Sequence, residues 1–480
     1  MNKLVPQSVF DCFAQVNAVP RPSKKEERMI AFLLDFGKKL GLESKRDEVG
    51  NVIIRKPATK GKEACPTVIL QSHMDMVCEK NADVQFDFER DAIQTYVDGD
   101  WLKAKGTTLG ADDGIGIAME MAVLQATDIE HGPLECVFTR DEETGLSGAE
   151  GMGSDFMTGS YLINLDSEDE GEIFISCAGG CRTNVTFSYT DEPTPAGSFA
   201  VELMVKGLTG GHSGDDIDKK RANANKLLVR FMYIAMKKYG LRIADIQTGG
   251  LHNAIPREAS AVVVVPAEHK ESLRVDWNIF AADVEQEFYV TEKTMRFEMQ
   301  SVEVPATLVD LDTNNRLITA LQAVHNGILS MSQDIELVET SSNLASIHKY
   351  ADKHEIVIAS SQRSSLLSAR NNMSNTIGAC FELAGAKVDT GEGYPGWAPK
   401  ADSHLLKVAV EQYKALFGKE PLVRGIHAGL ECGLFSEKYP HLDMVSFGPT
   451  LRGVHSPDEK LLIPTVDKVW RHLLAVLKAI

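Results

Sequence analysis

Three apolar, strand-like segments each end in acidic or histidine side chains. In chain order, segment 67–72 is followed by His73 and Asp75, segment 134–139 by Glu142 and Glu143, and segment 161–165 by Asp166. Open α/β sheets form their binding crevice at the carboxyl ends of the strands, so we expect these side chains to converge. A further acidic motif, Gly-Ala-Asp-Asp-Gly at 110–114, lies between the first two and opens a helical pattern.

Imidazole and carboxylate groups without a cysteine cluster suit zinc, cobalt or manganese. A shared carboxylate can hold two such ions about 3.5–4 Å apart, and a water bridging them loses a proton near neutral pH. The proton needs a nearby base. Of the adjacent acids Glu142 and Glu143, one can bind metal while the other accepts this proton.

Each motif by itself is more typical of a surface loop. A single His-x-Asp or Glu-Glu pair is usually solvated, and Asp-Asp-Gly commonly begins a turn or a helix. Their joint appearance at the ends of three successive strands favours a metal site, because cations would relieve the repulsion within acid-rich loops. The pair Cys177 and Cys181 is followed by no second Cys/His pair, and we interpret it as structural.

The order of these motifs resembles that of the co-catalytic zinc peptidases, the family that includes aminoacylases and glutamate carboxypeptidases. His-x-Asp, Gly-x-Asp-Asp-Gly, Glu-Glu-x-Gly, Asp and a late His follow one another as they do there. Motifs at 207–214, 253–256, 427–432 and 446–457 extend the resemblance over essentially the whole chain. Relatives with aminoacylase or carboxypeptidase activity tend to carry a lysine shortly after the bridging Asp. Here Asp112 is followed by Asp-Gly-Ile-Gly, which favours the dipeptidase branch.

The resemblance implies a role for each motif residue. The implied metal ligands, with Asp112 bridging the two ions, are His73, Asp112, Glu143, Asp166 and His455. Glu142 becomes the general base, and Asp75 orients the His73 ring, since a ligating imidazole needs its other N–H fixed. The family also implies a cis peptide bond between Asp112 and Asp113.

Further roles fall on residues of the middle of the chain. His212, in Gly-Gly-His-Ser-Gly, is implied to stabilise the oxyanion, in relatives often across a dimer. Asn253 and Arg363 are candidates for the polar end of the substrate. A guanidinium can hold a terminal carboxylate through two parallel hydrogen bonds, although a surface salt bridge explains Arg363 nearly as well. Gly429 lacks a Cβ and is a weaker candidate for close backbone approach to the substrate.

The bulk properties describe a globular enzyme rather than a nucleic-acid or membrane protein. The 480 residues exceed the usual size of a single core, so two domains are expected. A net charge of −18, with basic residues scattered among acids, argues against nucleic acid and anionic lipid as partners. Residues 1–18 lack the apolar core of a signal peptide, and the eight cysteines are irregularly spaced, which predicts a cytoplasmic location.

Alternating helix-like and strand-like segments predict an α/β domain, a mostly parallel sheet with helices on both faces. We expect this catalytic domain to be interrupted by an inserted α+β domain, a lid or dimerisation domain. The first part of the catalytic domain is predicted at 1–182, the inserted domain at 183–395, and the second part of the catalytic domain at 396–480. The expected helices are 24–42, 114–127, 221–238, 316–330, 365–383, 401–417 and 465–480.

The sequence therefore predicts a metallopeptidase that hydrolyses dipeptides with a C-terminal histidine, including β-alanyl-histidine (carnosine). Two divalent ions are expected, zinc first, with cobalt or manganese as alternatives, together with a homodimer formed through the inserted domain. Three alternatives stay open: an N-acyl amino acid deacylase on the same ions, a metal-binding or scaffolding protein without catalysis, and an acidic α/β protein without metal. The presence of both Glu142 and Glu143 argues against lost catalysis.

Overall fold

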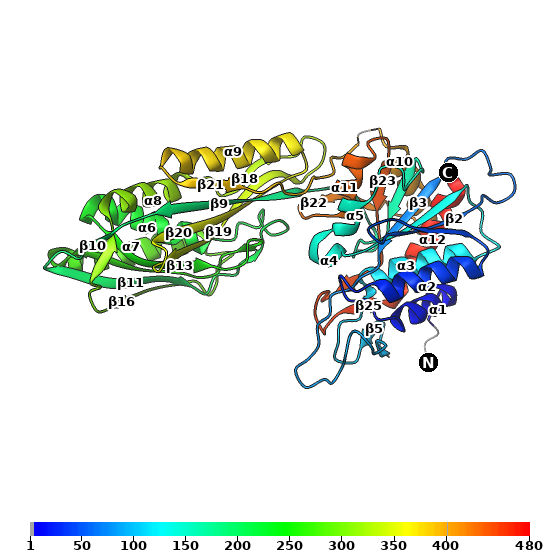
Figure 1. Cartoon of the computed structure of the whole chain (residues 1–480), viewed down its shortest axis with the longest axis horizontal. Coiled ribbons are helices and arrows are strands. Elements are labelled where there is room, and N and C mark those ends of the chain that lie inside the picture. Colours follow the sequence, from blue (N-terminus) through cyan, green and yellow to red (C-terminus); the bar gives the residue numbers. More distant parts are fainter. Residues whose placement is uncertain (1–3, 401) are drawn as a thin grey trace. The chain divides into compact units, whose positions relative to one another are not determined.

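The structure, a computed structural model, describes residues 4–400 and 402–480 and divides into two compact units (Figure 1). Unit 1 comprises Met1–Ser176, Trp397–Gly425 and Leu430–Ile480, and unit 2 comprises Cys177–Gly396 and Ile426–Gly429. Unit 2 therefore interrupts unit 1 in the sequence. None of the described helices combines the length and the apolar character that crossing a bilayer requires.

An eight-stranded sheet forms the centre of unit 1, in the order β1-β2-β6-β3-β7-β23-β8-β22. The central strands β6, β3, β7 and β23 run parallel, whereas β1, β2 and β8 join antiparallel. The strands are β1 (Glu43–Arg46), β2 (Val52–Lys56), β3 (Val68–His73), β6 (Leu134–Thr139), β7 (Tyr161–Asn164), β8 (Glu172–Cys177), β22 (Leu422–Ile426) and β23 (Asp443–Ser446). The predicted α/β class is confirmed, with a parallel core and antiparallel flanks.

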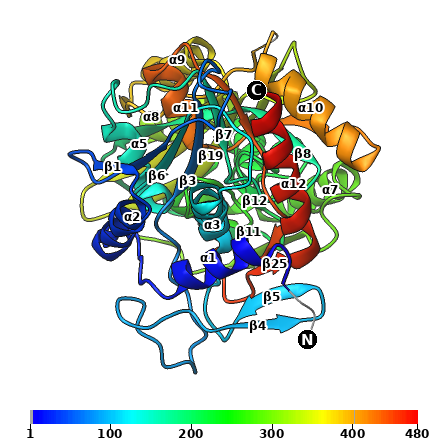
Figure 2. The same ribbon diagram turned by 90° about the vertical axis from the view of Figure 1, so that its right-hand side faces the viewer.

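Helices cover both faces of this sheet, as Figure 2 shows. Adjacent residues of β3 prove the point: the Ser72 hydroxyl donates to Glu120 of α3, and the Gln71 amide donates to Glu431 of α11. Consecutive side chains of a strand point to opposite faces, so α3 and α11 lie on opposite sides. The helices are α1 (Gln7–Asn17), α2 (Glu27–Lys39), α3 (Ala111–Gln125), α4 (Glu142–Gly145), α5 (Ser147–Gly151), α10 (His404–Phe417), α11 (Glu431–Lys438) and α12 (Ile463–Ala479). A small sheet adds β4 (Thr95–Asp98), β5 (Trp101–Ala104), β24 (Leu451–Arg452) and β25 (Lys460–Leu462).

Three buried polar side chains link the central strands. Asn164 of β7 stands directly opposite Gln71 of β3 on one side and Ser446 of β23 on the other. Its amide donates to Gln71 Oε1 at 2.7 Å, and the Ser446 hydroxyl donates to its Oδ1 at 2.5 Å. Because a one-residue slip would move every side chain to the other face, this ladder is satisfied in one register only.

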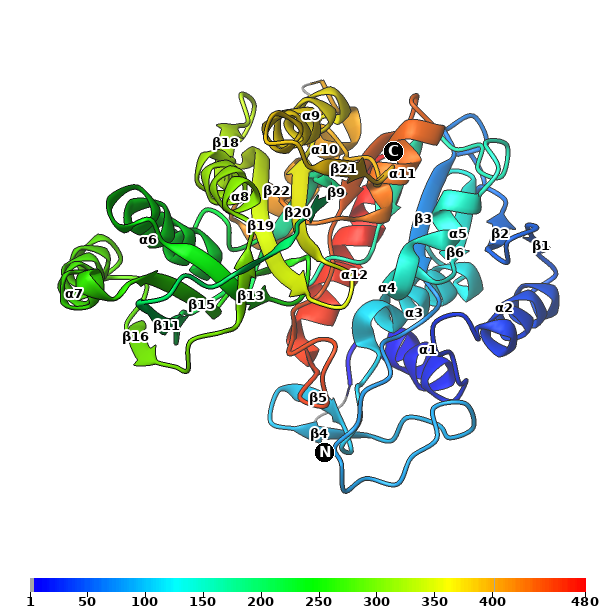
Figure 3. The ribbon, with the colours of Figure 1, turned by 60° about the vertical axis from the view of Figure 1, so that its left-hand side comes forward.

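Unit 2 is built on a nine-stranded sheet whose main path runs β16-β11-β15-β13-β19-β20-β9-β21, with β18 paired to β19 (Figure 3). Its helices pack against one face, where Val201, Val263 and Trp277 belong to a large apolar core. The longer strands are β9 (Gly179–Ser188), β11 (Ser198–Lys206), β13 (Arg242–Gly249), β15 (Ala259–Pro266), β16 (Arg296–Ser301), β18 (Gly327–Met331), β19 (Val338–Tyr350), β20 (Glu355–Ser364) and β21 (Lys387–Thr390). Short strands are β10 (Asp191–Pro193), β12 (Gly211–His212), β14 (Ala254–Ile255) and β17 (Thr307–Val309), and the helices are α6 (Ala224–Tyr239), α7 (Lys270–Glu287), α8 (Leu311–Ala323) and α9 (Leu367–Leu383).

The predicted helix 316–330 is wrong in its second half. Helix α8 ends at Ala323, and Gly327 to Met331 form strand β18. Gly327 has φ +101°, a conformation outside the helical region. The predicted helix 401–417 begins later, as α10 at His404, after Ser403 caps it by accepting the Leu406 N–H; Ala401 lies outside the described residues.

Candidate metal centre

The ends of the parallel strands and two helix starts bring the predicted ligands together in unit 1. Strand β3 ends at His73, and Asp166 follows the end of the neighbouring strand β7. Asp112 lies in the first turn of α3, and Glu143 in the short helix α4 that follows β6. The convergence that the strand order predicted is therefore present in the structure.

Asp112 lies between two groups of potential ligands. Its Oδ1 is 3.0 Å from His73 Nε2, which is also 3.5 Å from Asp166 Oδ1. Its Oδ2 is 3.2 Å from His455 Nε2, which is also 3.0 Å from Glu143 Oε2. In each group one ligand atom per residue lies within 4.8 Å of the others. Asp112 thus belongs to both groups and has the two-sided position expected of a bridging carboxylate. The Asp112–Asp113 peptide bond is cis, as the resemblance implied.

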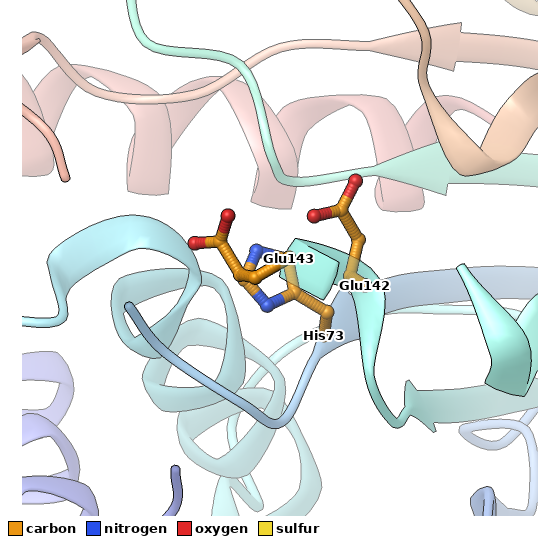
Figure 4. Close-up of side chains that lie close together, drawn as sticks. All are labelled: His73, Glu142 and Glu143. Carbon is orange, nitrogen blue, oxygen red and sulfur yellow. The ribbon is translucent and has the colours of Figure 1, made fainter. Parts of the chain in front are cut away.

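A third group combines His73 with both adjacent acids. Ligand atoms of His73, Glu142 and Glu143 lie within 4.8 Å of one another, and Figure 4 shows the three side chains converging. Glu143 also pairs with His455, whereas Glu142 makes no ion pair among the described residues. Glu143 therefore belongs to two of the candidate ligand groups and Glu142 to one, and only Glu143 makes an ion pair in the described part of the chain.

Asp75 fixes two parts of the site at once. Its Oδ1 lies 3.4 Å from His73 Nδ1 and accepts the Glu142 N–H at 3.0 Å. Its Oδ2 accepts the Glu143 N–H at 3.2 Å and the Ser23 hydroxyl at 2.7 Å. This fully buried carboxylate accepts hydrogen bonds from the backbone of both adjacent acids and lies beside the His73 imidazole, so it contacts more of the site than the sequence suggested.

Burial and the close approach of these side chains shift the pKa values of His73, Asp166 and Asp112. Burial alone would lower the pKa of His73, but the carboxylates of Asp166, Asp112 and Asp75 outweigh it and raise that pKa well above its usual range. Burial raises the pKa of Asp166 to about 7, against the attraction of His73. For Asp112 the opposite holds: despite burial, hydrogen bonds from His455 and His73 push its pKa far below the usual range.

The donor set fits a pair of divalent cations. Two imidazoles and several carboxylates are the ligands that zinc, cobalt and manganese share. Oε1 of Glu143 is buried and has no hydrogen-bond partner in the described part of the chain, so it is free to bind an ion. The residues that would hold the two cations are His73, Asp112 and Asp166 on one side, and Asp112, Glu143 and His455 on the other.

The candidate residues of unit 2 form a separate group. Arg363 Nη2 lies 3.2 Å from His212 Nε2, and its Nη1 donates to the Tyr394 hydroxyl at 3.2 Å. Asn253 is half-buried, and its carbonyl accepts the Ser213 N–H, so it borders the His212 loop. At Gly429 a Cβ would lie 3.0 Å from the ring of Tyr394, so packing against that ring already explains this glycine.

Sequence reasoning missed two acids beside the ligands. Burial and the carboxylates of Asp112 and Asp166 raise the pKa of Glu168 to about 8. Burial also raises the pKa of Glu431 to about 8, while Thr139 and Gln71 donate to its carboxylate at 2.7 Å. Glu168 lies in an acidic run, and Glu431 lies within the 427–432 motif, but neither was given a role, because only the three-dimensional structure brings them to the site.

Comparison with known proteins places the chain in a family. Residues 69–479 match the model of peptidase family M20/M25/M40, and the chain belongs to this family. It is therefore a metal-dependent enzyme that hydrolyses peptide bonds, which confirms the predicted enzyme class.

Individual relatives are similar to this chain over its full length. The chain is 41% identical to cytosol non-specific dipeptidase from Escherichia coli (strain K12), covering 100% of this chain and 99% of that protein. It superimposes on the crystal structure of aminoacylhistidine dipeptidase from Vibrio alginolyticus with a TM-score of 0.94 and 42% identity, covering 100% and 97% of the two chains. Aminopeptidase PepT from Bacillus cereus, at a TM-score of 0.57 and 16% identity over 98% of both chains, shares the fold.

Replacement of the shared ligand should empty the whole centre. In Asp112→Asn a neutral amide replaces the carboxylate that faces both histidines, so we expect bound metal to fall below one ion per chain. Elemental analysis after gel filtration measures this. Asp83→Asn, at an exposed acid of the same unit, is the control and should keep the wild-type metal content. Unchanged metal content in Asp112→Asn would rule out a shared ligand.

Proposed function

We propose that this chain is a dipeptidase that hydrolyses unblocked dipeptides, with a preference for a C-terminal histidine, β-alanyl-histidine included. The observation that carries the proposal is the position of Asp112 between two histidine–carboxylate groups, with the unpaired acid Glu142 beside them. Full-length similarity to a cytosol non-specific dipeptidase and to an aminoacylhistidine dipeptidase supports the substrate class and a cytoplasmic location.

Two divalent cations, zinc in our proposal with cobalt or manganese as alternatives, would polarise the scissile carbonyl and acidify the attacking water. Glu142 takes the proton of this water and returns it to the leaving amine. Burial, together with the charges of Asp166, Glu431 and Glu143, raises the pKa of Glu142 well above its usual range despite the attraction of His73. A raised pKa makes the carboxylate of Glu142 a stronger base towards the attacking water.

Glu168 is our candidate for the acceptor of the free amino group. In its acidic run Asp169 pairs with Arg452, Glu170 with Lys468, and Glu172 with Arg424. The carboxylate of Glu168 has no ion pair or hydrogen bond in the described part of the chain and lies within electrostatic range of Asp112, Asp166 and His455. A substrate ammonium group, which an N-acyl substrate lacks, would supply the positive charge that stabilises the ionised form of this carboxyl group, whose pKa is raised to about 8 without it.

Arg363 is the proposed partner of the substrate carboxylate. Its side chain is 8% exposed, its Nε is buried without a hydrogen-bond partner, and no carboxylate pairs with it among the described residues. It borders a cavity of about 390 Å³ in unit 2 that Arg182, His252 and Tyr394 also line. A buried guanidinium without a counter-charge is costly, and a ligand carboxylate would supply that charge.

His212 is the proposed oxyanion donor. Its Nδ1 lies 3.2 Å from the Asp215 N–H, and when it accepts this hydrogen bond the ring proton resides on Nε2. Arg363 Nη2 lies 3.2 Å from Nε2, and a substrate oxygen that entered between them could accept from both nitrogens in place of the contact they make with each other in the structure. A donor of this kind contributes about 3 kcal/mol to transition-state stabilisation. Asn253 and Gly429 remain weaker candidates for substrate contact.

A homodimer through the inserted domain is also part of the proposal. Its support is the family resemblance alone. Within one chain His212 and Arg363 already lie side by side, so their contact does not require a second chain. Light scattering coupled to gel filtration measures the mass directly, and a mass near 52.6 kDa would contradict the dimer.

Loss of the base should abolish turnover without loss of metal. In Glu142→Gln the amide cannot accept a proton, so we expect kcat on β-alanyl-histidine to fall by about 10²–10⁴-fold. Histidine release and metal content are measured on the same preparations. Glu150→Gln, at an exposed acid a few residues away, should behave as wild type. Retained turnover in Glu142→Gln would refute the assignment of the base.

Recognition of the free amino group of the substrate, which we assign to Glu168, distinguishes a dipeptidase from an N-acyl amino acid deacylase. We expect Glu168→Gln to raise KM for β-alanyl-histidine by about tenfold, in line with the loss of one charge-assisted hydrogen bond. Asp169→Asn, which removes a surface partner of Arg452, should leave KM unchanged. If metal-loaded wild type cleaves N-acetylated substrates but not free dipeptides, the N-acyl amino acid deacylase is the correct function.

A change of Arg363 to lysine tests whether its guanidinium binds the terminal carboxylate of the substrate. Arg363→Lys keeps the charge but loses the planar fork, so KM for dipeptides should rise by about tenfold or more. A dipeptide amide, which lacks the terminal carboxylate, should show no such difference between wild type and variant. Arg230→Ala, at a surface arginine paired with Glu287, is the control in the same unit. An equal KM for the free acid in all three proteins would exclude Arg363.

A further inference from the structure

Two buried side chains of opposite charge hold the backbone that carries the candidate ligands. Arg21 comes from the segment between α1 and α2, and Glu459 directly precedes β25 near the end of the chain. Their exposed fractions are 1% and 2%. Neither residue belongs to the ligand groups around Asp112, and the proposed catalytic steps do not involve them.

The side-chain carboxylate of Glu459 accepts hydrogen bonds from the backbone at the start of helix α3. Its Oε2 accepts the N–H groups of Leu109 at 2.7 Å and Gly110 at 2.9 Å, and its Oε1 accepts that of Ala111 at 2.8 Å. A longer contact of 3.4 Å reaches the N–H of Asp112 itself. The first N–H groups of a helix have no partner within it, and Gly110 provides no side-chain cap. Glu459 fulfils this role from almost 350 residues away.

Arg21 joins two loops that carry candidate ligands. Its Nη1 donates to the carbonyls of Met74 at 3.2 Å and Asp75 at 2.7 Å, and its Nη2 donates to the carbonyl of Gly110. One planar guanidinium therefore spans the loop after His73 and the loop before Asp112. A Cβ at Gly110 would lie 2.6 Å from Nη2, so this glycine leaves the space that the guanidinium occupies.

The hydrogen-bond partners of both charges are backbone groups rather than each other. Burial of a guanidinium or a carboxylate is costly, and each charge must be compensated by well-directed hydrogen bonds. Here the hydrogen bonds come from the two loops around the ligands, and the charges of Asp75 and Glu459 add to the compensation of Arg21. Any shift of either loop would break several of these bonds together, so the pair restrains the distance between His73 and Asp112, whose nearest atoms are 3.0 Å apart.

We infer that Arg21 and Glu459 are positioning residues that set the metal affinity and the turnover of this enzyme by fixing the spacing of the two ligand-bearing loops. This inference rests on the proposed metal centre. The competing explanation is that the two residues only stabilise the fold, as any buried hydrogen-bonded charge does.

Glu135 offers a matched control within unit 1. It is 1% exposed and accepts four hydrogen bonds, from Arg55 Nε, the Thr158 N–H, the Thr158 hydroxyl and the Gly159 N–H. It lies at the first half of β6, whereas the ligands follow the end of that strand roughly 13 Å away at about 3.3 Å per residue. Glu135→Gln therefore removes a comparable buried charge without touching the ligand loops.

The experiment compares wild type, Glu459→Gln, Glu135→Gln and Arg21→Lys as full-length chains. The zinc dissociation constant is measured by competition with a chromogenic chelator, the melting temperature on metal-free protein, and kcat and KM on β-alanyl-histidine. We expect Glu459→Gln and Glu135→Gln to lower the melting temperature by similar amounts. Only Glu459→Gln should weaken zinc binding, by about 10–100-fold, and lower kcat with little change in KM.

Arg21→Lys keeps the charge, but a single ammonium cannot span three carbonyls in two loops, so it should weaken zinc binding in the same way. This variant also serves if Glu459→Gln does not fold. The inference is overturned if zinc affinity in the foldable variants of Arg21 and Glu459 falls no further than in Glu135→Gln. A wild type that binds zinc but cleaves no dipeptide refutes the proposed substrate, whereas the comparison of zinc affinities still tests the positioning role.

Discussion

The carboxylate of Asp112 faces His73 with one oxygen and His455 with the other, and this sharing constrains the whole of unit 1. The two histidines lie on either side of unit 2 in the sequence, so the segments before and after it must fold as one body. The parallel strands supply the common edge at which these segments meet. Burial of the acids at this edge raises the pKa of Asp166, and the neighbouring Asp112 carboxylate adds to that rise; bound cations would offset both effects.

Local sequence patterns were sufficient to predict the central strands of the unit 1 sheet. The apolar run 134–139 is strand β6 residue for residue, and acids that follow such runs meet because strand ends meet. The family resemblance implied that Asp112 bridges two metal ions and that its peptide bond to Asp113 is cis. The cis bond is present, and Asp112 lies between two candidate ligand groups, whereas metal bridging stays a prediction. The chemical roles of Glu142, His212 and Arg363 stay predictions, since they concern a substrate.

Other features depend on distant partners and left no local pattern. Arg21 and Glu459 look like ordinary surface charges in the sequence, yet their hydrogen bonds reach backbone groups 53 to 350 residues away. Asp75 was expected to orient one imidazole, but it also holds the backbone of Glu142 and Glu143. The error at 327–331 has a related origin: β18 is held by its pairing with β19, which a helical spacing of apolar residues cannot reveal.

The polar ladder through Asn164 has a consequence for biosynthesis. Strand β7 is made early, but its neighbour β23, which carries Ser446, follows 279 residues later along the chain. Until then the edge of β7 is unpaired and one side of the Asn164 amide has no partner. Unit 2, nearly continuous in sequence, is made in full before β23 emerges. On the ribosome, therefore, the inserted unit can complete its sheet while the sheet that carries the candidate ligands must wait for β23.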